Sequence, residues 1–327
     1  MTQSTVSAAT SRVHLIAAFA AVYVLWGSTY VAIKFAVETL PPFVMAGARF
    51  TAAGLILLAW THWRGAPAAT WRQWKNAAVG GAFLIMISNG LVCWSEKRVD
   101  SSLAALMVAT VPLWMMTLDW LRPGGKRPRP LTGLGVLAGL VGVAILVWPE
   151  TGAVRIDPLG ILALIVATLA WSIGSLFTRT ADMGGSMLKG AAMQMLCGGV
   201  LQFAVGGLRG EWNEFDALHV TLKSVLSLVW LLVAGSLVGF TAYMWLLRHT
   251  STTRAATYAY VNPIVALILG AFLAQEELTP RRLIGACVVV GGVVLSLTFA
   301  STPPPRPASS EPPPDSPPVP PAVPRRI

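Results

Sequence analysis

Ten apolar segments, each close to 20 residues long, are the feature that most constrains this chain. A helix of about 20 apolar residues crosses the roughly 30 Å hydrocarbon core of a bilayer. Only 12% of the residues are charged, against about 25% in soluble domains, so an apolar solvent is indicated. The predicted spans are 15–37, 43–61, 77–95, 101–120, 131–149, 157–178, 187–208, 222–247, 255–274 and 281–300. We therefore expect an all-α integral membrane protein with ten transmembrane helices.

The orientation of these spans follows from the distribution of Lys and Arg. With the N-terminus in the cytoplasm, the inside segments hold fourteen of these residues and the outside segments hold seven. Cytoplasmic loops normally carry the excess of positive charge. We therefore expect a multi-pass membrane protein with both termini in the cytoplasm.

Two pairs of stretches recur at nearly the same offset. Residues 94–112 and 245–263 each begin with Trp and end with Pro, 18 positions later. At a similar offset "LWGSTYVAIK" meets "AWSIGSLFTR", which aligns Trp26 with Trp171. A duplicated five-helix unit is indicated. Because five is odd, the two repeats are inverted in the membrane, an arrangement that supports alternating access to a central site.

The composition limits the partners and cofactors of the chain. The net charge of +10 sits mostly between apolar runs, so nucleic-acid binding is not expected. Three Cys residues without a CxxC spacing indicate neither a disulfide framework nor a metal site, and no cofactor is expected. We expect a monomer whose partners are a small-molecule substrate and the lipid bilayer. The expected units are a cytoplasmic tail, two five-helix repeats and a disordered Pro-rich cytoplasmic tail, over 1–13, 14–150, 151–300 and 301–327.

Three stretches resemble the EamA branch of the drug/metabolite transporter superfamily. They are "YVLWGSTYVAIKFAVETLPPFVMAGARF", "PLGILALIVATLAWS" and "YVNPIVALILGAFLAQEELTPRRLIGACVVVGGVVL". The resemblance covers about residues 13–300. It implies ten helices in two inverted repeats, cytoplasmic termini and export of solutes across the bacterial inner membrane. Members of the family are associated with amino acids, including aromatic ones, with related metabolites and with toxic organic cations.

Polar and aromatic residues share one helical face in two of the spans. In span 1 this face carries Trp26 and Tyr30, and in span 6 it carries Trp171 and Ser175. A polar arc inside a span normally faces a cavity or another helix, not lipid. One interpretation is that the two Trp residues line the solute path from equivalent positions, and the other is that they pack between helices.

Further candidate substrate-binding residues lie in spans 3, 8 and 9. Tyr258 and Asn262 are four residues apart on one face of span 9, where an amide and a phenol could bind an amino or carboxylate group. Hydrogen bonding between helices is the alternative role for this pair. Ser88, Asn89 and Tyr243 complete the candidate list.

Two prolines and three cations also lie within the spans. Pro112 and Pro263 each remove a helical hydrogen bond near mid-span, so we predict kinks that act either as hinges or only in packing. Lys34 and Arg179 hold equivalent ends of spans 1 and 6, and we predict a pair of gate cations that snorkel and can pair with carboxylates. Arg49, six residues into span 2, is expected to form an ion pair or to snorkel toward the outer surface.

Other function classes have less support. No acidic residue lies at the centre of a span, which favours facilitated movement over proton coupling. An intramembrane enzyme would need converging catalytic groups, but the four His residues lie near span ends or in loops and no HExxH or GxSxG motif occurs. We therefore expect no catalytic residues. An exporter of toxic organic cations, a lipid scramblase and a structural membrane protein remain as alternatives to an amino-acid exporter.

Overall fold

The structure is a computed structural model that describes residues 13–121, 130–147, 157–184, 186–250, 255 and 257–299. All regular elements in these ranges are helical, and seven helices are long and apolar enough to cross a membrane. Three more apolar helices coincide with the predicted spans 5, 9 and 10: α8 (Pro130–Val147), α15 (Tyr258–Leu273) and α16 (Pro280–Thr298). The predicted all-α membrane fold is confirmed. The predicted disordered tail, 301–327, lies outside the described residues.

The spans are built from α-helices, three of which contain a π-helical segment. The first repeat contains η1 (Ala21–Leu25), α2 (Trp26–Ala36), α3 (Pro42–Trp63), α4 (Trp71–Gly81), η2 (Ala82–Asn89), α5 (Gly90–Ser95), α6 (Ser101–Val108), α7 (Val111–Leu121) and α8. The second contains α9 (Pro158–Thr180), α10 (Met187–Leu208), α11 (Glu211–Glu214), η3 (Ala217–His219), α12 (Leu222–Trp230), η4 (Leu231–Phe240), α13 (Thr241–His249), α15 and α16. The π-helical segments are η1, η2 and η4.

Polar caps and prolines fix where several spans begin. The Asp157 side chain accepts two amide hydrogen bonds from the first turn of α9, and Pro158 follows it at the first helical position. Thr70 and Gln73 form a reciprocal capping box at the start of α4. Such residues satisfy the amides that have no partner within a helix. This box starts the third span six residues before its predicted apolar beginning, in the polar segment "WRQWKN".

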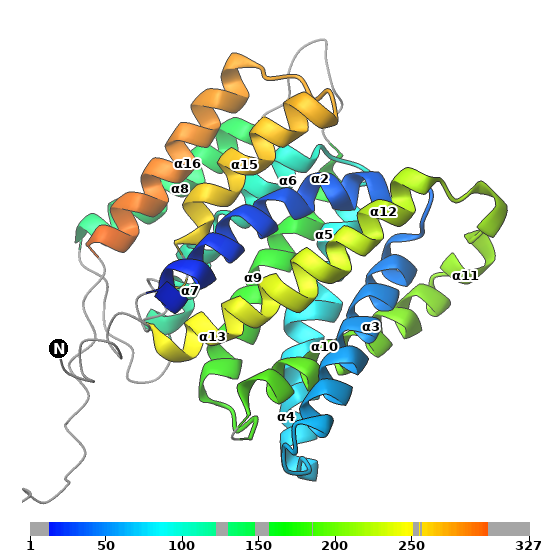
Figure 1. Ribbon diagram of the computed structural model, residues 1–327. Helices are drawn as coiled ribbons and strands as arrows, with labels where there is room; N and C mark the ends of the chain where they lie inside the picture. The colour runs from blue at the N-terminus through cyan, green and yellow to red at the C-terminus, as the bar shows by residue number, and fades with distance from the viewer. Residues whose placement is uncertain are drawn as a thin grey trace, which may run out of the picture.

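The two repeats pack through equivalent helices. Span 2 (α3) lies along span 7 (α10), and span 5 (α8) lies along span 10 (α16). Figure 1 shows α8 and α16 side by side at the upper left, with α3 and α10 on the opposite side of the bundle. Helix α2 of the first repeat packs against α15, while α9 of the second packs against α7. In both contacts, the first helix of one repeat packs against the fourth span of the other repeat. Spans 1 and 6 therefore lie at the centre of the bundle, where their side chains can form one site.

Glycines allow the paired outer helices to approach closely. An added Cβ at Gly54 of α3 would lie 2.6 Å from a backbone nitrogen of α10, and one at Gly199 of α10 would lie 2.5 Å from a backbone nitrogen of α3. Gly142 of α8 and Gly292 of α16 make the same kind of contact across the other pair. Small residues at helix interfaces are typical of membrane bundles. These two pairs therefore form a tightly packed frame around the central helices.

The outward faces of the spans are apolar. Large side chains such as Leu55, Ile56, Leu137 and Leu162 are each about half exposed in the isolated chain. A soluble monomer rarely exposes apolar surface on this scale. In a bilayer the same surface contacts lipid at no cost, so the exposed residues support the membrane-spanning interpretation of the helices.

Candidate functional site

A cavity of about 70 Å³ lies between the two repeats. Its wall comes from α2, α3, η2, α5, α6, α7, α9, η4 and α15. Six aromatic side chains contribute to it: Trp26, Tyr30, Phe50, Trp171, Phe240 and Tyr258. The charged group in its lining is Arg49, and the lining residues include no Asp or Glu. Pockets for small ligands measure about 300–1,000 Å³, so this cavity must widen before it can hold a solute.

Four aromatic rings meet on one side of the cavity. The Trp26 and Trp171 ring centroids are 5.5 Å apart in an edge-to-face arrangement. Tyr258 lies 5.3 Å from Trp26, and Tyr243 lies 5.0 Å from Trp26 and 5.4 Å from Trp171. Edge-to-face pairs at these distances are favourable beyond their buried area. The equivalent Trp residues of the two repeats are therefore in direct contact. They pack against each other between helices and also line the cavity, so both roles considered from the sequence apply.

The π-helical segment η4 positions the Trp26 side chain through a hydrogen bond and close packing. The indole Nε1 donates a hydrogen bond to the carbonyl oxygen of Gly235, at 3.1 Å. A methyl group on Gly239 would lie 2.4 Å from the same Nε1, so only glycine leaves room for the indole. π-Helical turns are frequent at functional sites. Here the segment places one ring of the first repeat against the backbone of the second.

Most of the predicted substrate-binding residues reach the cavity. Those in its lining are Trp26, Tyr30, Ser88, Asn89, Trp171 and Tyr258. The other three candidates are not part of its lining, and a role in binding stays a prediction for them: Ser175, Tyr243 and Asn262. The hydroxyls of Ser175 and Tyr243 are 2.9 Å apart and both side chains are buried, so this pair supports the aromatic cluster from behind.

Asn262 connects two helices. With its amide oriented to satisfy its surroundings, the nitrogen donates to the carbonyl oxygens of Tyr23, at 2.9 Å, and Tyr258, at 3.3 Å. The side chain is 2% exposed. Of the two roles that the sequence left open, the geometry shows interhelical hydrogen bonding. The Tyr23 hydroxyl also contacts the Thr257 hydroxyl, at 2.5 Å, and thus reinforces the junction of the first span with the start of α15.

Arg49 departs from the sequence-based expectation. It neither snorkels nor forms an ion pair among the described residues, and its side chain is 4% exposed. Its Nε donates to the Ser236 hydroxyl at 2.7 Å, and its guanidinium lies 4.5 Å from the Phe50 ring centroid. The reason is tertiary, because η4 of the second repeat covers this face of α3 and places the guanidinium beside the cavity.

The two predicted hinge prolines differ in their setting. Pro263 lies inside α15, as predicted. Pro112 does not lie in a helix interior, because span 4 is broken between α6 and α7 and Pro112 is the second residue of α7, in its first turn. Thr110 forms the break, with its hydroxyl donating to the Met107 carbonyl oxygen at 2.7 Å. Proline is tolerated in a first helical turn, so the break precedes the proline. A hinge role for either residue remains a prediction.

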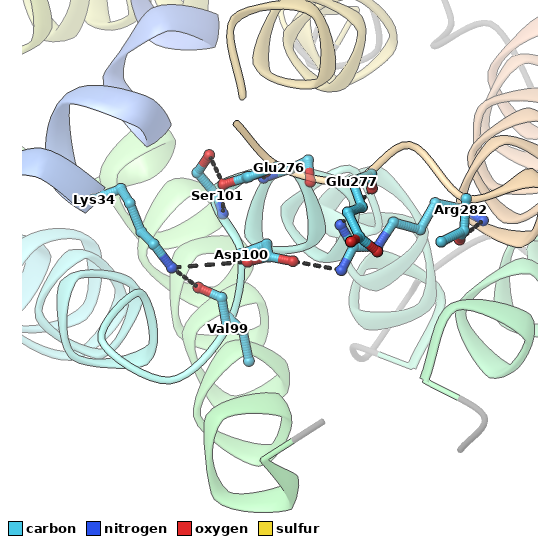
Figure 2. A network of polar contacts seen from close by, with 9 residues as sticks. Lys34, Val99, Asp100, Ser101, Glu276, Glu277 and Arg282 are labelled. Atoms are coloured by element: carbon cyan, nitrogen blue, oxygen red, sulfur yellow. Dashed lines mark hydrogen bonds and ion pairs between the residues drawn. The ribbon is translucent and has the colours of Figure 1, made fainter. Parts of the chain in front are cut away.

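The predicted gate cation Lys34 belongs to a polar network that crosses between the repeats (Figure 2). Its Nζ donates to the Val99 carbonyl oxygen at 3.0 Å and lies 3.9 Å from the Asp100 carboxylate. Asp100 also forms an ion pair with Arg282, which donates to the Glu277 carbonyl oxygen at 2.8 Å. We call this end of the bundle the Lys34 end. The network ties span 1 and the start of span 4 to the start of span 10.

A glutamate of the second repeat caps the first helix of span 4 at the same end. Glu276 accepts hydrogen bonds from the Ser101 amide at 2.7 Å, the Ser101 hydroxyl at 2.6 Å and the Ser102 amide at 3.1 Å (Figure 2). Burial acts to raise the pKa of Glu276, but these hydrogen bonds lower it below its ordinary value overall. The carboxylate is therefore ionised at neutral pH and stabilises the positive end of α6.

Glu96, which directly follows span 3, is completely buried beneath this network. Neither of its carboxyl oxygens has a hydrogen-bond partner among the described atoms. Burial raises the pKa of Glu96 well above its ordinary value, the Lys34 charge lowers it in part, and Glu276 adds to the rise. This carboxyl therefore favours its protonated form in its buried position.

The other predicted gate cation, Arg179, lies at the opposite end of the bundle, which we call the Arg179 end. It is exposed near the end of α9 and lines a second cavity of about 240 Å³ with Asp182 and Arg248. The remaining wall comes from α9, α10, α13 and the segment after α9. Lys34 and Arg179 therefore occupy equivalent span ends at opposite ends of the bundle, and Lys34 belongs to the partly buried network described above. Gating by either residue stays a prediction.

The sequence model of the EamA-like transporter family matches residues 13–148 and 158–298, once over each half of the chain. The chain belongs to this family. The double match, the equivalent helix pairs and the two central Trp residues agree on an architecture of two repeats. The chain is thus a membrane transporter.

Known proteins resemble the transporter over most of its length. An uncharacterised inner membrane transporter of Escherichia coli strain K12, YedA, is 37% identical over 282 residues, which cover 86% of this chain and 90% of YedA. A probable amino-acid metabolite efflux pump of the same strain is 22% identical and covers 84% of this chain and 92% of the pump. A protein of known crystal structure shares the fold, with a TM-score of 0.64, 20% identity and coverage of 88% of this chain and 98% of that one. These relatives place the transporter in the inner membrane as a multi-pass protein.

Sequence reasoning missed two charged residues of the transporter. Arg49 was expected to form an ion pair or to snorkel toward the outer surface, and Glu96 was not among the candidate residues, yet both are buried. The available signal was the position of Arg49 inside an apolar run, since an ionisable group within a span is a candidate functional residue by default. Among the described residues no group of three or more His, Cys, Asp or Glu is placed to hold a metal ion.

Proposed function

We propose that this transporter exports amino acids with aromatic or other hydrophobic side chains, or closely related small metabolites, by alternating access. The observation that carries the proposal is the contact of Trp26 with Trp171 at a cavity between the two repeats. Inverted repeats that rock against each other expose such a site to each side of the membrane in turn. The aromatic wall suits an apolar solute body, and Ser88 and Asn89 supply polar groups.

The proposed orientation places the Lys34 end in the periplasm and the Arg179 end in the cytoplasm, with both termini cytoplasmic. It rests on the excess of Lys and Arg in the segments assigned to the inside. In this orientation the network around Asp100 closes the periplasmic side. The small volume of the cavity then corresponds to a contracted state of the site.

The proposed transport is facilitative. Proton-coupled carriers commonly hold a titratable carboxylate in the solute path. The residues that line the cavity include none, and Glu96 lies outside the lining. Solute would therefore move down its own gradient, and an imposed pH gradient would leave the initial rate of efflux unchanged apart from effects on folding.

Efflux from proteoliposomes tests the proposal. The purified transporter is reconstituted with labelled phenylalanine, leucine, glutamate, an organic cation and a labelled lipid, and release of each is followed. We expect the hydrophobic amino acids to leave fastest. Trp26→Ala and Trp171→Ala should reduce their efflux, whereas Trp60→Ala, which alters an exposed ring on α3, should not. Efflux that both cavity variants leave unchanged would refute the proposed lining, and transfer of lipid alone would identify a scramblase.

A further inference from the structure

The Arg49 guanidinium is incompletely satisfied. Its Nε bonds to Ser236, but its Nη1 is buried without a hydrogen-bond partner. No carboxylate forms an ion pair with it among the residues that the structure describes. Arginine keeps its charge in proteins, and an isolated buried charge is strongly unfavourable without a counter-charge. The site therefore holds one positive charge without a counter-charge and at least one hydrogen-bond donor without an acceptor.

The second repeat is shaped around this guanidinium. A methyl group on Gly235 would lie 2.5 Å from Nη2 of Arg49 and 3.0 Å from Thr29, so the absence of a side chain there makes room for the charge. The carbonyl oxygen of the same Gly235 accepts the Trp26 hydrogen bond, and the next residue, Ser236, accepts the one from Arg49. One short segment of η4 thus positions both the aromatic and the cationic part of the cavity wall.

The rest of the lining indicates what would complement this charge. Besides its aromatic rings, the wall carries Ile33, Val92, Val108 and Val111, and it includes no acidic side chain. An organic cation would meet an uncompensated positive charge in a medium of low dielectric constant, which is strongly repulsive. A planar carboxylate instead matches the donor fork of arginine, and an apolar body matches the remaining wall.

We propose that Arg49 anchors the carboxylate of the solute, so that the transporter selects small monocarboxylates with an apolar or aromatic body, amino acids among them, over organic cations. The inference rests on the proposed function only in taking this cavity as the solute site. Binding of the carboxylate would bring a counter-charge to Arg49 and provide an acceptor for Nη1. The second repeat, through Gly235 and Ser236, would hold the guanidinium in position for it.

The test uses ligands that share one benzyl group and differ in charge. Phenylalanine and 3-phenylpropionate carry a carboxylate, whereas 2-phenylethylamine and phenylalaninamide do not. Binding to the purified full chain is measured by calorimetry and by ligand-induced shifts in melting temperature. We expect both carboxylates to bind. Arg49→Gln should weaken their binding on the order of 10- to 100-fold, as expected for loss of charge-assisted hydrogen bonds, with Arg49→Lys in between. Both ligands without a carboxylate should bind weakly to every form.

Two further variants separate the anchor from a general effect on folding. Arg209→Gln removes an exposed guanidinium that also lies near aromatic rings, 5.5 Å from the Trp94 centroid, and should change affinity less than twofold. Gly235→Ala keeps the charge but displaces the guanidinium, so it should reproduce the loss in Arg49→Gln. Because Arg49→Gln removes an unpaired buried charge, its melting temperature without ligand should equal or exceed that of the wild type.

Three results would overturn the role of Arg49 as the carboxylate anchor. The first is that 3-phenylpropionate binds the wild type and Arg49→Gln with equal affinity, and the second is that the wild type binds 2-phenylethylamine as tightly as 3-phenylpropionate. The third is that neither carboxylate ligand binds. If Arg49→Gln fails to fold, Gly235→Ala takes its place in the test, and equal affinity of 3-phenylpropionate for the wild type and Gly235→Ala would overturn the anchor. Efflux from proteoliposomes is scored separately. Carboxylate-selective binding without efflux would remove the proposed export function and support the Arg49 site, whereas amino-acid efflux unaffected by Arg49→Gln would support export and remove the site.

Discussion

Replacing Glu276 with glutamine changes one oxygen of a side chain into an NH2 group at the start of α6. In the wild type the carboxylate accepts three hydrogen bonds, from the two Ser101 donors and from the Ser102 amide. Glutamine fits the same space and can accept the hydrogen bonds of Ser101. Its NH2 group, however, then faces the Ser102 amide, so two donors meet where a donor and an acceptor met before.

The cost of this replacement follows from two contributions. Loss of a carboxylate beside a helix N-terminus costs about 0.3–1 kcal/mol at an exposed site and up to ~2 kcal/mol at a partly buried one. A buried donor left without an acceptor costs about 1–3 kcal/mol. Because Glu276 is 9% exposed, we take the upper part of the first range. The sum is roughly 2–5 kcal/mol, which corresponds to a fall in melting temperature of about 4–20 °C at the about 2–4 °C per kcal/mol typical of large domains.

The native Cys93 reports whether this loss opens the Lys34 end. Its side chain is completely buried in α5, whereas Cys197 is partly exposed and Cys287 is exposed. In a background with both other cysteines changed to serine, Glu276→Gln should raise the rate of Cys93 alkylation by an order of magnitude or more. Glu277→Gln is the matched control, because the neighbouring carboxylate is exposed and only its backbone carbonyl contacts Arg282.

The same prediction has a pH signature. Since the pKa of Glu276 is lowered on folding, its contribution is present at neutral pH and is lost as the pH falls through the lowered value. The melting temperatures of the wild type and Glu276→Gln should therefore converge in acid. Equal melting temperatures and equal Cys93 alkylation in the Glu276 and Glu277 variants at pH 7 would refute the capping argument.

Two other substitutions test buried polar groups. Because the pKa of Glu96 is raised on folding, its neutral form stabilises the protein below the ordinary value of 4.5, and that stability is lost as the pH rises through the raised value. Relative to the wild type, the melting temperature of Glu96→Gln should therefore increase as the pH rises above 4.5 toward the raised pKa, and a difference that does not change with pH would contradict this assignment. Asn262→Leu should lower the unfolding free energy by about 0.6–1.7 kcal/mol, as for an interhelical hydrogen bond in a membrane, while changing solute affinity less than twofold. A larger loss of affinity would return Asn262 to the binding site.

The spans and the central Trp residues were predictable because they depend on local patterns. Apolar length located all ten segments, and helical periodicity placed Trp26 and Tyr30 on the inward face of span 1. The same periodicity put Tyr258 and Asn262 on one face. It could not show that the Asn262 amide would donate a hydrogen bond to the Tyr23 carbonyl oxygen of another span. Which of two inward residues meets a cavity depends on the neighbouring helix.

The buried charges were not predictable because their surroundings are distant in sequence. Arg49 bonds to Ser236, 187 residues away, and the charges that act on Glu96 belong to Lys34 and to Glu276, which is far away in the sequence. Hydropathy gives the depth of a side chain in its own span but not the element that covers it. The π-helical segments add to the difficulty, since a residue inserted into a helical turn rotates the faces on either side of it.

The carboxylates that cap α3 and α6 also affect how the protein is made. The first two amides of α6 bond to Glu276, and those of Phe43 and Val44 in α3 bond to Glu211. These partners lie 175 and 168 residues farther along the chain. When the first repeat enters the membrane during synthesis, the start of α3 therefore lacks its acceptor until Glu211 has been made, and the start of α6 lacks its acceptor until most of the second repeat has been made. The first half of the molecule is completed by its second half, and a chain that stops before Glu276 would be a substrate for quality-control proteases.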